Sequence, residues 1–177
     1  MIRTILTLGL VVAFAACSDG TTPDLLAPDD AAFAKNNVVA SATGSGHATF
    51  DDAWRTFSFN VRTRLDGSVD GRYQLHNRVV EGHFQAGHLT CMSVVGSTAW
   101  VAGTIDRSYD PDHVGRYVRF IVVDNGEGDA VDQISWMYPS TNPGADLEFC
   151  ANMYTAPLHE VEAGNIQVRG ADVIGGL

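Results

Sequence analysis

A short Gly-rich segment past the middle of the chain carries a dense group of oxygen-bearing side chains, namely Asp124, Asn125, Glu127, Asp129 and Asp132. Ca²⁺ takes about six to eight oxygen ligands, and closely spaced carboxylates on such a loop supply several of them. The spacing differs from the alternating acidic pattern of an EF-hand. The segment therefore predicts either a calcium site or a solvated turn whose charges prevent unwanted strand pairing.

Three histidines in one region raise the question of a zinc site. Zinc needs three or four ligands that converge on one point. His83 and His88 have opposite parity in a strand, and the Ala86-Gly87 pair lies between them, while His76 is further away. No His-x-x-x-His pair occurs in the sequence. We therefore expect surface histidines.

The sequence has no motif for a catalytic nucleophile or for a bound nucleotide. It lacks a Gly-x-Ser-x-Gly elbow, a paired Cys/His signature, a P-loop and a dinucleotide fingerprint. Glu81, Glu148 and the acids of the loop can be paired as in a glycosidase, but any acidic β protein offers such pairs. Trp54, Trp100 and Trp136 can form a sugar-stacking platform or, by default, part of a core. We predict no catalytic residues.

The acidic segment joins two segments with strand character. One face of a strand over residues 117–123 carries Val118, Phe120 and Val122, and one face of the return carries Ile134, Trp136 and Tyr138. Asn125-Gly126 is a strong signal for a tight hairpin turn. Residues 127–132 are poor strand formers, however, so we expect a longer loop over residues 124–132.

Alternation of apolar and polar residues elsewhere predicts a chain of short strands, over residues 57–62, 72–79, 89–95, 99–105, 147–153 and 166–169. No convincing long helical period appears. We therefore predict an all-β fold, a single antiparallel β-sandwich or an up-and-down β-barrel of short strands. Hairpins that follow one another in sequence favour a meander.

Composition limits the classes of partner. The chain is long enough for one ordinary domain, and its abundant glycine fits a turn-rich β protein. The formal net charge is −10, with no basic patch to offset it. A strongly acidic domain repels nucleic acid, so we exclude nucleic-acid binding.

The first 17 residues predict a targeting segment. Arg3 is followed by an apolar run that is too short to span a bilayer well, and Ala15-Ala16-Cys17 closes it. This ending resembles the lipobox of bacterial lipoproteins, although Phe14 replaces the usual aliphatic residue. The resemblance implies that Cys17 is acylated and anchors the protein to a membrane. An ordinary signal peptide cut near Ala16, giving a secreted soluble protein, is the alternative.

Two further segments complete the predicted organisation. Residues 18–46 are rich in small and polar residues, with Pro23, Pro28 and Gly44-Ser45-Gly46, and we expect a flexible tether, with an edge strand from Val38 and Val39 as an alternative at its end. Residues 47–177 form the predicted β-rich domain. Ser18 follows the cysteine where enterobacterial lipoproteins retained at the inner membrane have Asp, which favours an outer membrane if the organism has one.

Four stretches of the predicted domain resemble a known module, starting at Gly71 (GRYQL), His88 (HLTCMSVVGSTA), Val123 (VDNGEGD) and Gly164 (GNIQV). Together they resemble the post-COAP domain, a small β-rich module of bacterial secreted proteins and lipoproteins. The resemblance covers roughly residues 47–169. It implies an extracytoplasmic β domain and transfers no catalytic residues.

These observations predict an extracytoplasmic, lipid-anchored β protein with a non-catalytic role in binding, adhesion or envelope structure, through an unidentified protein or glycan partner. A lipocalin-like barrel that carries a small apolar ligand is the alternative. A hydrolase of glycans or esters is third. The first two differ in whether the interior is filled by aromatic side chains, Phe57, Phe59, Trp100, Phe120 and Trp136, or leaves a pocket of ligand size.

The remaining cysteines predict a disulfide. With Cys17 acylated, Cys91 and Cys150 allow one pairing, and the targeting segment sends them to a compartment where disulfides persist. In a strand over residues 147–153, Cys150 lies on the side opposite Phe149, which argues against the pairing unless a bulge intervenes. Two buried free thiols are the alternative.

Overall fold

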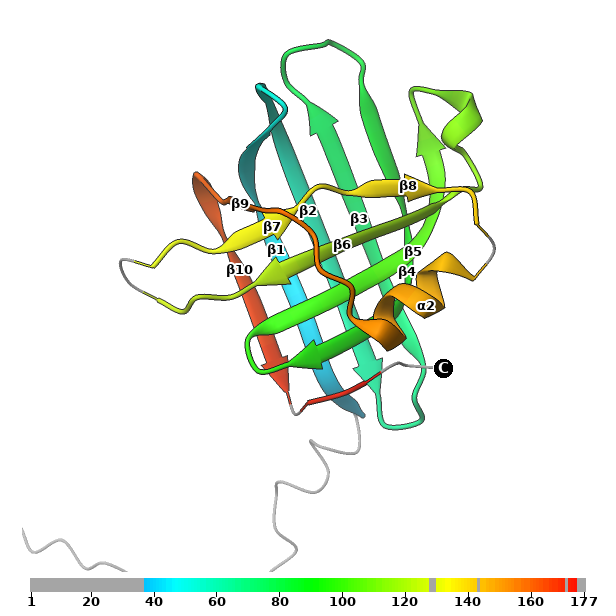
Figure 1. Ribbon diagram of the computed structural model, residues 1–177, viewed down its shortest axis with the longest axis vertical. Coiled ribbons are helices and arrows are strands. Elements are labelled where there is room, and N and C mark those ends of the chain that lie inside the picture. The colour runs from blue at the N-terminus through cyan, green and yellow to red at the C-terminus, as the bar shows by residue number, and fades with distance from the viewer. Residues whose placement is uncertain (1–36, 128–129, 143, 171, 175–177) are drawn as a thin grey trace, which may run out of the picture.

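Ten strands pair into one antiparallel sheet that curls into a half-barrel (Figure 1). The computed structural model describes residues 37–127, 130–142, 144–170 and 172–174. The first five strands are β1 (Val38–Phe50), β2 (Ala53–Arg64), β3 (Val69–Asn77), β4 (Phe84–Val95) and β5 (Thr98–Ser108). The others are β6 (Tyr117–Val123), β7 (Gln133–Ser135), β8 (Tyr138–Ser140), β9 (Leu158–Glu160) and β10 (Ala163–Gly170). A 3₁₀ turn, η1 (Pro111–His113), and one helix, α2 (Ala145–Asn152), complete the elements.

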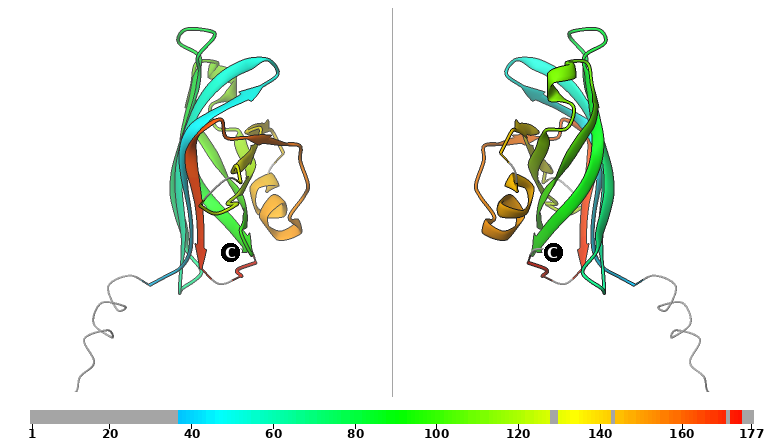
Figure 2. Two further views of the ribbon diagram at one scale, coloured as in Figure 1. Left: turned by 90° about the vertical axis from the view of Figure 1, so that its left-hand side faces the viewer. Right: turned by 90° about the vertical axis from the view of Figure 1, so that its right-hand side faces the viewer.

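The order of the strands confirms the predicted all-β class. Strands β1 to β7 pair in chain order, as expected of a meander, while β10 pairs with β1, β9 with β7, and β8 with β6. The sheet bends so that β5, β6 and β7 lie across β1, β2 and β3, with α2 outside the layer of β5 and β6 (Figure 2). The result lies between the two predicted architectures, because one sheet supplies both layers.

The space between the two layers is filled by side chains. Phe57 and Phe59 of β2, Tyr73 of β3 and Phe120 of β6 are all buried. The rings of Phe59 and Phe120 meet edge to face with centroids 5.4 Å apart. The period-2 pattern that predicted these strands therefore directs their apolar residues into one core.

The sheet begins earlier than predicted. The expected tether ends at residue 46, but β1 starts at Val38 and pairs with both β2 and β10. The glycines that indicated a break serve close packing instead. A Cβ at Gly44 would lie 2.6 Å from Phe59 Cε1 and 2.9 Å from Ile166 Cγ1, so only glycine lets these two side chains cover the strand.

The predicted return strand after the acidic loop is broken into two short strands. β7 pairs with the end of β6 and β8 with its beginning, so Ile134, Trp136 and Tyr138 do not share one continuous strand. Between the pairs, Ile121 donates its backbone N–H to the Ser135 hydroxyl at 2.9 Å. That hydroxyl donates in turn to the Trp136 carbonyl at 3.0 Å. One side chain therefore bridges the interrupted ladder.

The predicted strand over residues 147–153 is wrong, because residues 145–152 form α2. Its buried residues, Ala145, Phe149 and Cys150, are spaced as on one face of a helix. Asp146 and Glu148 lie in the first turn, where negative charge is favourable. The apparent alternation of Leu147 and Phe149 is therefore coincidental, and Leu147 is exposed.

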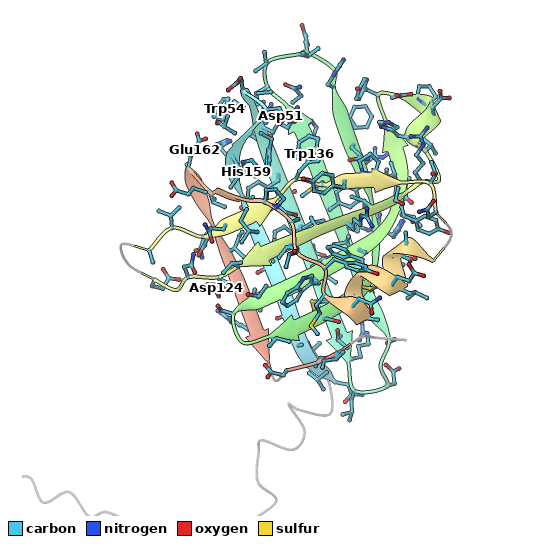
Figure 3. The ribbon with its side chains drawn as sticks, viewed as in Figure 1. Asp51, Trp54, Asp124, Trp136, His159 and Glu162 are labelled. Atoms are coloured by element: carbon cyan, nitrogen blue, oxygen red, sulfur yellow. A yellow bond between two sulfur atoms is a disulfide. The ribbon has the colours of Figure 1, made fainter. Side chains whose placement is uncertain are left out.

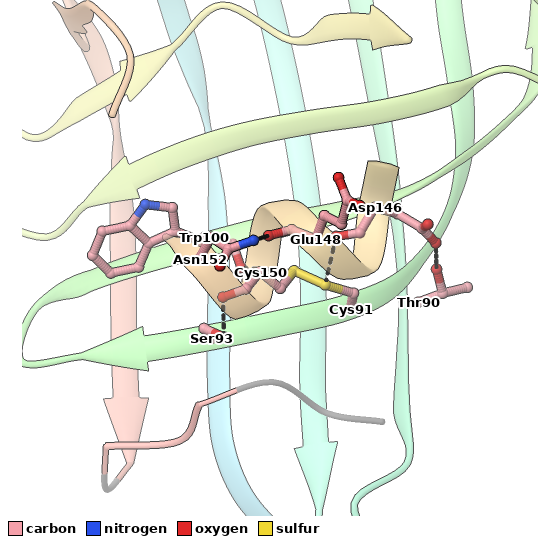
Figure 4. The surroundings of a disulfide bond; sticks show 8 residues. All are labelled: Thr90, Cys91, Ser93, Trp100, Asp146, Glu148, Cys150 and Asn152. Carbon is pink, nitrogen blue, oxygen red and sulfur yellow. Dashed lines mark hydrogen bonds between the residues drawn. A yellow bond between two sulfur atoms is a disulfide. The ribbon is translucent and has the colours of Figure 1, made fainter. Parts of the chain in front are cut away.

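A disulfide joins Cys91 of β4 to Cys150 of α2 (Figure 4), with Cα atoms 6.3 Å apart. The helical conformation removes the parity argument against the pairing. The Ser93 hydroxyl donates to the Cys150 carbonyl at 2.8 Å, and the buried side chains of Ala102, Ile121 and Phe149 surround the bond. This second, smaller core holds α2 against the outer face of the sheet.

The two edges of the sheet are connected by one continuous segment. Its first part, β9, pairs with β7, and its second part, β10, pairs with β1. At the change of partner, Val161 donates its N–H to the Asp132 carbonyl at 2.9 Å, and Glu162 donates to the His47 carbonyl at 2.9 Å. The half-barrel is thus closed at this end by the chain itself.

Two carboxylates of the acidic loop close the remaining gap between β10 and the loop after β6. The N–H of Ile166 donates to Asp132 Oδ2 at 2.7 Å, and the N–H of Val168 donates to Asp124 Oδ2 at 2.8 Å. The other oxygens accept within the loop, Asp132 Oδ1 from Asn125 N at 2.9 Å and Asp124 Oδ1 from Gly126 N at 2.9 Å. The two side chains therefore take the place of a neighbouring strand's carbonyls.

The far end of the half-barrel is covered by the C-terminal segment. Val173 and Val94 exchange two backbone hydrogen bonds, of 2.7 and 2.9 Å. Gly96 donates its N–H to Asp172 Oδ1 at 2.9 Å, and Val173 packs against the core. The C-terminal segment is therefore tied to the end of β4 and adds an apolar side chain to the core.

We expect Asp132→Asn to destabilise the fold. Asp132 is buried, and in the variant one of its two N–H partners would face an amide N–H₂ in place of an acceptor. The free energy of unfolding should fall by about 1–3 kcal/mol, measured by urea denaturation. Glu127→Gln is the matched control, because it removes an exposed carboxylate from the same loop. Equal stability of the two variants would contradict the closing role.

Removal of the disulfide should also destabilise the protein. The bond joins residues separated by 59 positions, for which the chain-entropy model gives a stabilisation of about 4 kcal/mol. Cys91→Ala/Cys150→Ala should therefore unfold at lower denaturant concentration than Cys17→Ala, the control. Two alkylatable thiols in the non-reduced wild-type protein, detected by mass, would contradict the disulfide.

Candidate ligand-binding site

Four polar residues form a layer at the open end of the half-barrel. Arg55 of β2 pairs with Asn77 of β3, and Gln85 of β4 pairs with Leu75 of β3 and Ser108 of β5. Because the strand period is two, Arg55 and Asn77 share the inward face of Phe57 and Leu75. The register thus places a guanidinium, two amides and a hydroxyl directly above the aromatic core.

These side chains line a cavity of about 180 Å³, which we call the mouth pocket. Its apolar walls come from Leu75, Phe84, Trp136, Met137 and Pro139, and its remaining polar lining from His83, Tyr109 and His113. Figure 3 shows Trp136 and His159 on the segments that cross the front of the sheet, near Asp51 and Trp54 of the β1–β2 hairpin. The pocket thus combines aromatic surface with several hydrogen-bonding groups.

Arg55 is held by the β1–β2 hairpin and by a tryptophan. Asp51 and Asp52 form the two-residue turn with positive φ of 49° and 57°, and Arg55 Nη1 donates to the Phe50 carbonyl at 2.5 Å. The guanidinium carbon lies 4.2 Å from the centre of the Trp136 ring, a cation–π geometry. The side chain is therefore oriented before any ligand arrives.

The electrostatic environment of Arg55 leaves its charge without a close counter-ion. Partial burial lowers the pKa of the guanidinium, and the nearby Asp51 carboxylate and Tyr109 offset this in part. Arg55 forms no ion pair with any residue that the structure describes. An arginine stays protonated regardless, so the mouth pocket holds a fixed positive charge.

Gln85 is the most deeply placed polar group of the pocket. It retains 9% of its exposure, and its side-chain amide makes no hydrogen bond within the described part of the chain. Among the described residues, the buried side-chain polar atoms without a partner are His47 Nδ1, Thr63 Oγ1 and the Tyr73 hydroxyl oxygen, so the amide of Gln85 is open to the cavity. Both of its polar atoms, a donor and an acceptor, are thus available to something that enters the cavity.

Two aromatic rings stack at the rim. His83 and Tyr109 lie face to face, with centroids 3.7 Å apart and planes 13° from parallel. His113 Nε2 lies 3.6 Å from an Asp110 carboxylate oxygen. The rim therefore adds a flat aromatic surface, part of which is exposed through Tyr109.

The predicted calcium ligands that the structure describes, Asp124, Asn125, Glu127 and Asp132, do not line this pocket. Asp124 and Asp132 use all four carboxylate oxygens for backbone N–H groups, and Asn125 donates its amide to the Val131 carbonyl at 2.6 Å. Glu127 is exposed, and Asp129 lies outside the described residues. The calcium site stays a prediction. The carboxylate oxygens of Asp124 and Asp132 already accept hydrogen bonds, so each could bind an ion only through its remaining lone pair.

The three histidines considered for zinc are not brought together. His76 packs against Phe84, His83 stacks on Tyr109, and His88 Nδ1 contacts a carboxylate oxygen of Asp106. Within the described residues, no group of three or more His, Cys, Asp or Glu side chains is arranged to hold a metal ion. The expectation of surface histidines fits His88, which is exposed.

The three tryptophans lie in different parts of the structure and do not form one platform. Trp54 is 44% exposed and packs against His47 with the two rings tilted by 32°. Trp100 lies beside the second core, where its Nε1 donates to the Tyr154 carbonyl at 3.0 Å. Trp136 is the one that lines the mouth pocket.

Two further predictions concern the N-terminal region. Cys17, the predicted acylation site, lies outside the described residues. No helix in the described ranges is both long and apolar enough to cross a membrane.

Comparisons with protein-family models, with curated proteins and with solved structures found no match. The resemblance to the post-COAP domain therefore stays a prediction. Function has to be inferred from the geometry of the chain itself.

Sequence reasoning did not identify the mouth pocket. Arg55, Gln85 and Tyr109 are scattered among ordinary strand residues, and none belongs to a motif. The available signal was Arg55 and Asn77, which occupy inward positions near the ends of strands whose neighbouring inward residues, Phe57 and Leu75, are apolar. A polar residue at such a position indicates either a partner or a cavity.

Proposed function

We propose that this chain is an extracytoplasmic, lipid-anchored β protein whose role is non-catalytic binding, with the mouth pocket as its ligand site. The observation that carries the proposal is one aromatic-lined cavity in which Arg55 has no ion-pair partner, and the amide of Gln85 no hydrogen bond, among the described residues. Small-molecule sites combine apolar walls with a few polar groups in this manner. The lipid anchor rests on the sequence of residues 1–17.

The packing of the interior favours a small ligand over the lipocalin-like alternative. Phe57, Phe59 and Phe120, which were expected to fill or to line the interior, are buried against one another. The described cavity starts above them and holds about 180 Å³, which is below the roughly 300–1,000 Å³ of typical ligand pockets. A long apolar ligand along the barrel axis would require these rings to leave the core.

The polar chemistry of the pocket favours binding over hydrolysis. Its lining holds no carboxylate, so the acid pair of a glycosidase cannot be assembled there from the lining residues. Outside the pocket, Asp124 and Asp132 stabilise the fold through backbone hydrogen bonds. This distribution supports a site that holds a molecule without transforming it.

We expect Cys17 to carry the lipid. Radiolabelled fatty acid should enter the wild-type protein and the Cys91→Ala/Cys150→Ala variant, but not Cys17→Ala, because acylation requires the thiol of the processed N-terminus. The measurement is fluorography of the purified protein. Label that is absent from the wild type, or that persists in Cys17→Ala, would contradict the anchor.

We expect small single-ring molecules to bind at the mouth pocket. The test is a library of such fragments with negative, positive and no charge, added to the full chain in lipid nanodiscs. Met137 lines the pocket, whereas Met92 and Met153 do not, so its ¹³C-methyl resonance should move alone. Gln85→Phe should abolish the shift by filling the cavity, whereas Gln74→Phe on the outer face should preserve it. If no fragment of any charge moves Met137, the proposed function is contradicted.

A further inference from the structure

We propose that the mouth pocket is selective for a small, planar, single-ring anion of the aromatic carboxylate class. This inference rests on the proposed binding function and adds the chemical class of the ligand. Three properties of the pocket carry it: its volume, the sign of its charge, and the free amide at its base.

The volume sets the size of the ligand. A dry engineered cavity of about 150 Å³ in another protein accepts benzene, and the mouth pocket has about 180 Å³. One six-membered ring with a short substituent therefore fits within the pocket. Phe84 and Trp136 in the walls offer aromatic surface to such a ring.

The charge of the pocket sets the sign of the charge on the ligand. The chain as a whole has a formal net charge of −10, yet Arg55 is the one fixed charge in the lining, and it is positive. Asp51 near Arg55 and Asp110 beside His113 lie outside the lining. A carboxylate on the ligand would supply the counter-ion that Arg55 lacks, through a charge-assisted hydrogen bond from its Nε or Nη2 atom. Neither atom has a partner among the described residues.

The amide of Gln85 sets the orientation. Gln85 is more than nine-tenths buried, and it pairs with Leu75 across β3 and β4, so that it projects from the inner face of the sheet. Its amide atoms are not among the fully buried polar atoms without a partner, so the amide faces the space of the pocket and can bond a ligand there. A polar substituent on the ring, or the second carboxylate oxygen, can satisfy it while Arg55 holds the anionic end.

The direct test compares benzoate with benzyl alcohol and with benzylamine, which differ mainly in charge. Titration of each into the full chain in nanodiscs is followed by the Met137 methyl resonance and by calorimetry. We expect benzoate to bind at least about tenfold more tightly than either analogue, since a charge-assisted hydrogen bond is roughly twice as strong as a neutral one. Sodium acetate, which carries the same charge without a ring, should bind more weakly than benzoate.

Two variants separate ligand recognition from structure. Gln85→Leu should weaken benzoate binding by about tenfold while it leaves the melting temperature close to that of the wild type, because the amide of Gln85 faces the pocket and makes no hydrogen bond within the described residues. Arg55→Gln should remove the preference for benzoate over benzyl alcohol. The matched controls Gln74→Leu and Arg72→Gln lie on the exposed face of β3 and should bind benzoate as the wild type does.

The outcomes distinguish the inference from the proposed function. If benzyl alcohol or benzylamine moves Met137 as effectively as benzoate, the pocket binds ligands but the anion selectivity is overturned. The same holds if Arg55→Gln retains the preference for benzoate, because the selectivity would then arise elsewhere. If none of the compounds shifts the Met137 methyl resonance, and no fragment of the wider library does so either, both the inference and the proposed function are contradicted.

Discussion

The architecture depends on how a curled sheet satisfies its two free edges. An unpaired edge exposes a row of N–H and C=O groups that must find partners. Here the segment from β9 to β10 pairs with β7 and then with β1, and the carboxylates of Asp124 and Asp132 receive the N–H groups on the outer edge of β10. Two short side chains thus replace a missing strand, and their negative charge, buried at Asp132 and half-buried at Asp124, is matched by four backbone donors.

This closure determines what the interior can hold. With β6 and β7 drawn toward β10, the two layers of the sheet lie close enough for Phe59 and Phe120 to meet. The volume that a wider barrel would leave open is taken up by aromatic rings, as close packing of a core requires. Space remains where the strands extend beyond the closing segment, and there the inward positions of β2, β3 and β4 are occupied by Arg55, Asn77 and Gln85.

Local sequence patterns predicted most of the strands. The features that were not predicted, the helix α2, the closing carboxylates and the mouth pocket, depend on long-range contacts. The alternation around Phe57, Tyr73 and Phe120 reflects burial of one face, which a sequence displays directly. The helix α2 was not predicted because its eight residues, with Leu147 and Phe149 two apart, fit the strand period as well as the helix period. The disulfide that holds the helix on β4 is a tertiary contact, which a local pattern does not display. Nothing near Asp132 in the sequence indicates that its partner is Ile166, and the mouth pocket exists only once β2, β4 and η1 have been brought together.

The acidic loop and the mouth pocket differ in one property that separates a folding device from a binding site. The carboxylates of Asp124 and Asp132 are conspicuous in sequence, but each of their oxygens already accepts a hydrogen bond from the chain. Arg55 and Gln85 are inconspicuous, yet they keep unpaired donors at a place from which water is partly excluded. Partial desolvation of the Arg55 charge costs stability, and a protein retains that cost where it gains a ligand in return.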